Sequence, residues 1–537
     1  MVIFFSESIN IILYFSVLKI TKLANFSVKN SILSLVIQKR IKNIDKFINK
    51  PFDCQNEIFK YLIKKGKKTS FGKEHNFDKI IDYNTFKKNI PIRKYEELAP
   101  YINKIRNGEN DVLWPGKIKR FAKSSGTTNS KSKFIPITDE CLQECHFKAG
   151  KDMLALYENN FPKSDLYNGK GLMLGGSLNT TSKDKNQEGD LSAILLNEFP
   201  FWVSYHRVPD LKTALMKEWD EKLNKIAHQA MNENITSLTG VPSWMLILLK
   251  RILALSGAKS ISDLWPNLEL YMHGGVNFEP YKKQFQELIP SKKMNYLENY
   301  NASEGFIAVQ DQSPSKGMLL MLDYGIFYEF LDMDKYRKGE LDTINLKNVE
   351  LGKKYALIMS TNAGLWRYMI GDIIEFTSIS PFRIKISGRT KSCINTFGEE
   401  LMVHNTDQAI SEACKKYNCS INDYTIAPIF IDKKSGGHQW FIEFEKKPVD
   451  IELFMKKIDN ILKQLNSDYE AKRTDDLILK FPEVIVIENK EFYIWLKQNN
   501  RLGGQNKIPR LNESRKIAEE IITIKNKFST NFTTNNN

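Results

Sequence analysis

A cluster of hydroxyl side chains around one glycine is the first feature of this sequence that could do chemistry. It lies in FAKSSGTTNSKSKFIPIT (121–138), where four hydroxyl residues flank Gly126 and two lysines follow: Ser124, Ser125, Thr127, Thr128, Lys131 and Lys133. Backbone N–H groups, hydroxyls and ammonium charge in one loop can wrap a polyphosphate. The spacing is not that of a Walker loop, and for this stretch alone a flexible polar turn is an equal alternative.

A second group of polar residues lies in LENYNASEGFIAVQ (297–310), soon after YMHGGVNFEPY (271–281). Tyr300 offers a flat ring, Ser303 a hydroxyl, and Glu304 a hard oxygen ligand suited to Mg²⁺. The alternative for this stretch alone is a strand that ends in a turn with a solvated glutamate.

A third motif, GLWRYMIGDIIEF (364–376), places an aspartate directly after a glycine. Gly371 permits a tight turn, and Asp372 can accept two hydrogen bonds from the vicinal hydroxyls of a ribose. An acidic turn residue before a strand is the common alternative.

The elements that must position these motifs alternate between strands and helices. Apolar residues recur at helical spacing from Lys29 to Lys67, with a break at Pro51, and predict a helical N-terminal layer. Short apolar runs predict strands at 171–176, 268–275, 355–361 and 373–376, and longer patterns predict helices at 211–231 and 243–255. This alternation indicates an α/β layered domain.

After Gly388 the pattern changes. Strands are predicted at 424–432, 438–445 and 483–488, with a helix from Asp450 to Leu465. The fold class is therefore α/β, with a large domain at 29–388 and a small α+β domain at 389–537. Residues 1–28 form an N-terminal extension whose apolar run is too short to span a bilayer, so no stable membrane span is expected.

Composition restricts the class of protein further. The net charge is +15, but lysine is scattered through the chain and no nucleic-acid-binding module is visible, so nucleic acid is not an expected partner. The six cysteines include no C-x-x-C pair, and the seven histidines show no metal-ligand spacing. Reduced thiols predict a cytoplasmic protein, and a monomer is the default expectation.

The order of the three motifs resembles the adenylate-forming superfamily, and their details resemble its auxin-responsive acyl-acid amido synthetase family. The resemblance spans roughly Lys39 to Ala518. It is carried by TSFGKEHNF (69–77), IPIRKYEELAPYINKIRNGE (90–109), SSGTTNSKSKFIPIT (124–138), TGVPSW (239–244), YNASEG (300–305), LWRYMIGD (365–372) and GGQNKIPRL (503–511).

The resemblance implies a role for each matching residue. The four hydroxyl residues would hold the phosphates of ATP, Tyr300 would stack on adenine, and Ser303 would contact the AMP phosphate. Glu304 would help to hold Mg²⁺, and Asp372 would bind the ribose. Lys507 would neutralise charge during adenylation. The residues that would line the adenine edge are His273, Gly274 and Gly275.

The implied activity is ligation of a carboxylic acid to an amino acid through an acyl-AMP. SGRTKSCINTFGEEL (387–401) resembles the hinge on which the small domain turns, which would let one site run two half-reactions in sequence. One departure is visible, because the family usually has glycine near Asn129–Ser130. A thioester-forming ligase that uses coenzyme A and an inactive binding protein of the same fold are the alternatives. The acid and the amine acceptor stay open.

Overall fold

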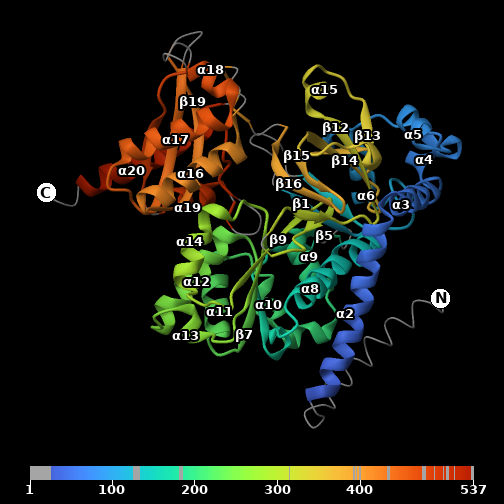
Figure 1. Cartoon of the computed structure of the whole chain (residues 1–537), viewed down its shortest axis with the longest axis horizontal. Helices are drawn as coiled ribbons and strands as arrows, with labels where there is room; N and C mark the ends of the chain where they lie inside the picture. Colours follow the sequence, from blue (N-terminus) through green and yellow to red (C-terminus); the bar gives the residue numbers. More distant parts are fainter. Residues whose placement is uncertain are drawn as a thin grey trace.

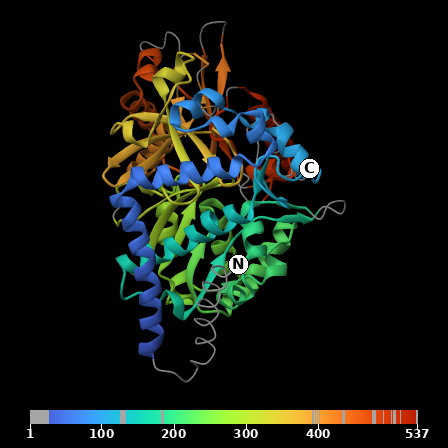
Figure 2. The same ribbon diagram turned by 90° about the vertical axis from the view of Figure 1, so that its right-hand side faces the viewer.

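Two helices at the N-terminal side of the chain meet at Pro51, as the apolar spacing predicts. Helix α2 (Phe26–Asn49) ends directly before α3 (Pro51–Gly66), and proline occupies the first position of α3, where its missing N–H is not needed. Figure 2 shows the sharp turn of the chain between them. A partly buried ion pair joins α2 to helix α8 (Lys148–Asn160): Arg40 Nε lies 2.6 Å from Asp152 Oδ1.

The computed structural model describes most of the chain. The described residues are 26–124, 133–180, 186–313, 315–390, 393–394, 396–397, 399, 401–431, 436–473, 479–488, 490–499, 501–502, 507–512 and 514–533. The masked stretches include most of the N-terminal extension and the hydroxyl-rich loop. None of the helices among these residues combines the length and the hydropathy that a membrane span requires.

A twelve-stranded sheet forms the centre of the large domain, in the order β13-β12-β14-β15-β16-β11-β10-β9-β8-β7-β3-β6. Its second half is parallel, from β9 to β6. The strands of this half are β3 (Lys170–Met173), β6 (Arg207–Val208), β7 (Ile235–Thr239), β8 (Leu270–Gly274) and β9 (Asn295–Ala302). Parallel strands present their carboxyl ends at one edge, which is where α/β proteins commonly bind ligands.

The first half of the sheet is antiparallel and contains long hydrophobic strands. Its strands are β10 (Gly305–Val309), β11 (Met318–Leu320), β12 (Ile326–Asp332), β13 (Thr343–Asn345), β14 (Lys354–Thr361), β15 (Tyr368–Ile379) and β16 (Phe382–Arg389). A separate four-stranded sheet has the order β2-β1-β5-β4. Its strands are β1 (Arg120–Ser124), β2 (Lys133–Ile137), β4 (Leu178–Thr180) and β5 (Gln187–Gly189).

Helices cover both faces of the parallel half. In Figure 1, α11 to α14 lie on one side of β7 and α8 and α9 on the other. Tyr271 and Met272, neighbours on β8, point to opposite faces and join two different hydrophobic clusters.

The remaining helices of the large domain are α4 (Ser70–Glu74), α5 (Tyr83–Asn89), α6 (Tyr95–Arg106), α7 (Asp139–Cys141), α9 (Leu191–Glu198), α10 (Leu211–Ala214), α11 (Trp219–Met231), α12 (Pro242–Ser256), α13 (Ile261–Leu264), α14 (Glu279–Leu288) and α15 (Met333–Arg337).

The predicted helix over 211–231 is wrong in one respect, because the structure divides it into α10 and α11. No proline or glycine stands at 215–218 to explain the break. Trp219, the first residue of α11, is buried and packs edge-on against Trp244, with ring centroids 4.8 Å apart. Tertiary packing of this tryptophan therefore outweighs local helix propensity.

The C-terminal part forms a smaller α+β unit around the three-stranded sheet β19-β20-β21. Its strands are β17 (Cys393–Ile394), β18 (Leu401–Met402), β19 (Ser420–Phe430), β20 (Gly436–Lys446) and β21 (Glu483–Ile487). Its helices are α16 (Val403–Tyr417), α17 (Ile451–Leu465), α18 (Ser467–Arg473), α19 (Glu491–Gln498) and α20 (Lys516–Thr533). Asp450 caps α17 by accepting a hydrogen bond from Leu453 N, as expected for a helix start.

The small domain packs against α14 of the large domain (Figure 1). One hydrophobic cluster is shared between the two domains: it joins Phe278 and Phe285 of the large domain to Phe441 and Ile508 of the small domain. Burial of apolar surface therefore stabilises this relative orientation of the domains.

Candidate active site

The turn between β9 and β10 holds two of the predicted site residues. Ser303 and Glu304 are both buried there. The Tyr368 hydroxyl donates to Glu304 Oε1 at 3.1 Å. Burial raises the pKa of Glu304, and the nearby charge of Lys133 opposes that shift. Residues 297–310 therefore form a hairpin with a buried carboxyl group, and the alternative of a turn with a solvated glutamate is wrong.

Asp372 lies on β15 and is held by two donors. Its Oδ1 accepts from Arg389 Nε at 2.6 Å, and its Oδ2 accepts from the Tyr300 hydroxyl. The register of β15 with β16 places Asp372 directly opposite Arg389. Asp372 is 5% exposed, whereas the Arg389 side chain is half exposed. The carboxylate is thus fixed in place, with a cationic neighbour that solvent can reach.

The chain after β8 approaches β9 very closely. A Cβ atom on Gly274 would clash with the backbone oxygen of Asn299, so only glycine fits there. Gly275 has φ +79°, a conformation that also favours glycine. The His273 ring stacks on Phe278 with centroids 4.1 Å apart, and burial lowers its pKa to about 3. The ring therefore belongs to the aromatic cluster, and the proposed contact with adenine would come from the backbone.

Lys507 reaches this same glycine from the small domain. Its Nζ donates to the carbonyl oxygen of Gly275, across the boundary between the domains. Desolvation, followed by the charges of Arg389 and Arg510, lowers the pKa of Lys507 to about 8, while Asp372 opposes the shift. The ammonium group consequently lies within electrostatic reach of the Asp372–Arg389 pair.

The structure brings most of the predicted site residues to one place, where β8, β9 and β15 meet the small domain. Tyr300 is 5% exposed and bonded to Asp372, so its stacking on adenine stays a prediction. Ser124 ends β1 and pairs in register with Lys133. Ser125, Thr127 and Thr128 lie outside the described residues.

Two neighbours of the predicted residues were not predicted as site residues. They are Arg389, beside Asp372, and Tyr368, beside Glu304. Both lie in motifs that the sequence singles out, yet their partners are 17 and 64 residues away along the chain. Only strand pairing could reveal these contacts.

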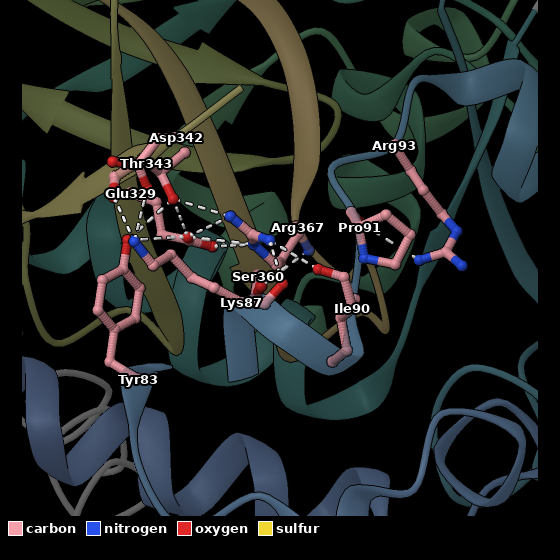
Figure 3. A network of polar contacts seen from close by, with 10 residues as sticks. All are labelled: Tyr83, Lys87, Ile90, Pro91, Arg93, Glu329, Asp342, Thr343, Ser360 and Arg367. Carbon is pink, nitrogen blue, oxygen red and sulfur yellow. Dashed lines mark hydrogen bonds and ion pairs between the residues drawn. The ribbon is translucent and has the colours of Figure 1, made fainter. Parts of the chain in front are cut away.

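A network of polar contacts surrounds Arg367, the residue directly before Tyr368 (Figure 3). Arg367 adopts φ +44°, and its Nε donates to both oxygens of Glu329 at 3.1 and 3.0 Å. Its guanidinium also donates to Thr343 Oγ1 at 2.8 Å and to the Ile90 carbonyl at 2.6 Å. The side chains of Arg367 and Glu329 are 4% and 0% exposed.

The backbone beside Arg367 is held as firmly as its side chain. The Arg93 N–H donates to the Arg367 carbonyl at 3.0 Å, and the Met369 N–H donates to the Arg93 carbonyl at 2.8 Å. These hydrogen bonds lie at the residues directly before and after Tyr368, whose hydroxyl donates to Glu304. The network therefore fixes the start of β15, from which Tyr368 and Asp372 reach the site.

The chemistry of the site suits a nucleotide. Asp372 supplies an acceptor for hydroxyl groups, and Lys133, Arg389 and Lys507 supply cationic donors for phosphate. Within the described part of the chain, no three histidine, cysteine or acidic residues group together as a metal site. Glu304 therefore belongs to no such group, and one or two carboxylates plus substrate phosphates is a usual way to hold Mg²⁺.

Family models match most of the chain. The GH3 family N-terminal domain matches residues 40–294, the central domain 319–389 and the C-terminal domain 404–516. The solved structure of the GH3.15 acyl acid amido synthetase in complex with 2,4-DB superposes with a TM-score of 0.75 at 17% identity, covering 91% of this chain and 96% of that chain. A 2-hydroxyisobutyryl-CoA ligase shares the fold with a TM-score of 0.58 at 11% identity, covering 89% and 91%.

Similar sequences come from plants. An indole-3-acetic acid-amido synthetase of Arabidopsis thaliana is 24% identical over 63% of this chain and 74% of its own length. A jasmonoyl–L-amino acid synthetase of Nicotiana attenuata is 22% identical over 63% of this chain and 69% of its own length. With its N-terminal, central and C-terminal parts all matched in order, the chain belongs to the GH3 family.

Proposed function

We propose that this protein is an ATP-dependent acyl acid amido synthetase. It joins a carboxylic acid to ATP, giving an acyl-AMP and pyrophosphate, and transfers the acyl group to the amine of an amino acid, giving an amide and AMP. The relatives named as amido synthetases support this reaction, and ATP use follows from the adenylate-forming fold.

The observation that carries the proposal is the position of Lys507. A lysine from the small domain lies on the Gly275 loop of the large domain, beside Asp372 and Arg389. Negative charge builds on the α-phosphate and the leaving pyrophosphate during adenylation, and a preorganised cation stabilises that charge. This orientation of the domains therefore suits the first half-reaction.

The other residues would bind and orient the nucleotide. Asp372 would accept hydrogen bonds from the ribose hydroxyls, and the backbone at Gly274 and Gly275 would border the adenine. The hydroxyl-rich loop and Lys133 would hold phosphate oxygens. Glu304 would ligate Mg²⁺, which when bound would offset phosphate charge.

The test is carboxylate-dependent exchange of labelled pyrophosphate into ATP, without any amine. The panel contains indole-3-acetate, jasmonate, aromatic carboxylates and fatty acids. Exchange with one class would support adenylation and identify the acid. A folded protein that neither binds ATP nor supports exchange would contradict the proposal.

A coenzyme A ligase is the second candidate, because such a ligase shares the fold. Turnover of the acid that supports exchange is measured with each of the amino acids and with coenzyme A. Acceleration by an amino acid and AMP release would support the amido synthetase, whereas acceleration by coenzyme A alone would favour the thioester ligase. We further propose a cytoplasmic monomer, in keeping with the free thiols of the five cysteines whose side chains the structure describes and with a small-molecule reaction.

Replacing Asp372 with alanine should weaken ATP binding about tenfold, because a hydrogen bond to a charged group contributes about 1.5 kcal/mol or more. The fold should survive, since the Arg389 side chain is half exposed and water can solvate it. Calorimetric titration with Mg-ATP measures the affinity, and thermal unfolding checks the fold. Asp78→Ala, at an exposed aspartate, is the control. Unchanged affinity in Asp372→Ala would remove the ribose role.

Exchange should depend on pH through Lys507. Its pKa is about 8 instead of the usual 10.5, so the ammonium form is lost as pH rises through 8. With subsaturating ATP, the rate should fall about tenfold per pH unit above that point. Arginine stays protonated, so in Lys507→Arg this fall should move to higher pH. A flat profile up to pH 9.5 in the unmutated protein would contradict the assignment.

A further inference from the structure

Two of the motifs that define the site contain residues that the reaction itself does not use. Tyr281 ends YMHGGVNFEPY and lies on α14 of the large domain. Arg510 belongs to GGQNKIPRL of the small domain, three residues after Lys507. The Arg510 Nη2 atom donates to the Tyr281 hydroxyl at 2.7 Å. This bond crosses between the domains, close to the lysine.

Arg510 is anchored mainly within its own domain. Its Nη1 atom donates to Asp423 and to the Tyr424 carbonyl, and the guanidinium lies 4.2 Å above the Tyr424 ring. Its Nε atom lies 4.0 Å from Asp407 Oδ1. If the small domain turned, Arg510 would keep these partners, and Tyr281 is the hydrogen-bond partner that it would lose among the described residues.

The same segment also fixes the position of Lys507. The Ile426 N–H donates to the Arg510 carbonyl at 2.9 Å, and Thr425 donates to the Pro509 carbonyl at 2.5 Å. Lys507 is thus attached to β19 through Pro509 and Arg510. The hydrogen bond to Tyr281 then joins the segment from Lys507 to Arg510 to α14. Tyr281 lies six residues after Gly275, which Lys507 contacts.

We propose that Arg510 and Tyr281 form a latch that holds the small domain in the adenylation orientation and opens when the domain turns for acyl transfer. The latch rests on the proposed two-step function. A neighbouring bond, from Gln284 Nε2 on α14 to the Ile421 carbonyl on β19 at 2.8 Å, lies along the same contact. Tyr281 and Arg510 are positioning residues, because neither is placed to touch the substrates.

Tyr281→Phe is the sharpest test, because it removes the one hydroxyl and keeps the buried ring. Replacing Arg510 instead would leave Asp407 and Asp423 buried without their cation and would endanger the fold. Tyr296→Phe is the matched control: Tyr296 belongs to the same aromatic cluster, and its buried hydroxyl has no hydrogen-bond partner among the described residues.

Tyr281→Phe should slow pyrophosphate exchange about tenfold, with each acid that supports exchange in the unmutated protein. Conversion of the corresponding synthetic acyl-AMP to amide should stay the same or become faster. A merely structural defect would slow both half-reactions together. Equal slowing of both, or no change in either, would overturn the latch, as would the same effect in Tyr296→Phe.

Hydrogen–deuterium exchange with Mg-ATP as the probe gives a second readout that needs no turnover. In Tyr281→Phe, the amides of α14 and of the first half of β19 should exchange about tenfold faster than in the unmutated protein, whereas Tyr296→Phe should not change them. Unchanged protection would overturn the latch. If the unmutated protein neither binds ATP nor supports pyrophosphate exchange, the proposed function fails, and the protection of α14 and β19 in the two variants still decides whether the contact holds the domains.

Discussion

Lys507→Ala should slow acyl-AMP formation by about 100- to 1,000-fold, the usual effect of removing one preorganised donor to a developing negative charge. Its Nζ donates a hydrogen bond to the Gly275 carbonyl and interacts electrostatically with Asp372 and Arg389. The reacting phosphates are expected at this position. The conversion of preformed acyl-AMP to amide should change little, because pyrophosphate has already left.

The two half-reactions are measured separately, by pyrophosphate exchange and by release of AMP from synthetic acyl-AMP with an amino acid. Lys497→Ala, at an exposed lysine on α19, serves as the control and should leave both rates unchanged. Equal slowing of both steps by Lys507→Ala would show that the lysine does not act specifically in adenylation.

Arg367→Met should lower the free energy of unfolding by about 3 kcal/mol, because it leaves the Glu329 carboxylate buried without its cation. Tyr83 and Thr343 would still donate hydroxyl bonds to Glu329, which places the effect at the lower end of the usual range. Denaturant titration measures the change. Pyrophosphate exchange should fall as well, because the network fixes the strand that carries Tyr368 and Asp372.

The matched control is Arg337→Met, at an exposed arginine whose ion pair with Asp334 spans 3.4 Å. An exposed pair contributes about 0–1 kcal/mol, so its loss should be small. The double variant Arg367→Met with Glu329→Met should recover much of the lost stability, because neither charge then stays buried alone. Equal destabilisation by the single and double variants would show that the pairing of charges is not the cause.

The sequence indicates the residues that we propose to bind the nucleotide, but it does not indicate the residues that hold them in place. Glu304, Asp372 and Lys507 are recognisable because each stands at a fixed place in a motif, and the structure brings their segments together. Arg389 could not be assigned in the same way, since its contact with Asp372 depends on the register of β15 and β16. Register is set by the packing of whole strands, which no short motif encodes.

The fold shows the same division between local and long-range information. The break that the sequence predicts at Pro51 is where α3 starts, and the helix predicted from Asp450 starts at Ile451 with Asp450 as its cap, because a proline and a capping aspartate act on their own neighbours. The break between α10 and α11 depends instead on the contact of Trp219 with Trp244, 25 residues further along. Periodicity alone gives no sign of such a contact.

The hydrophobic cluster shared by the two domains makes their arrangement sensitive to temperature. A turn of the small domain would expose apolar side chains such as Ile508 and Phe278 to water. Because the free energy gained by burying apolar surface decreases on cooling, cold conditions should favour the separated arrangement and warmth the packed one. The ratio of the rates of the two half-reactions would then change with temperature, because burial of this apolar interface is accompanied by a change in heat capacity. This would hold even if the chemical steps at the phosphates were unaffected.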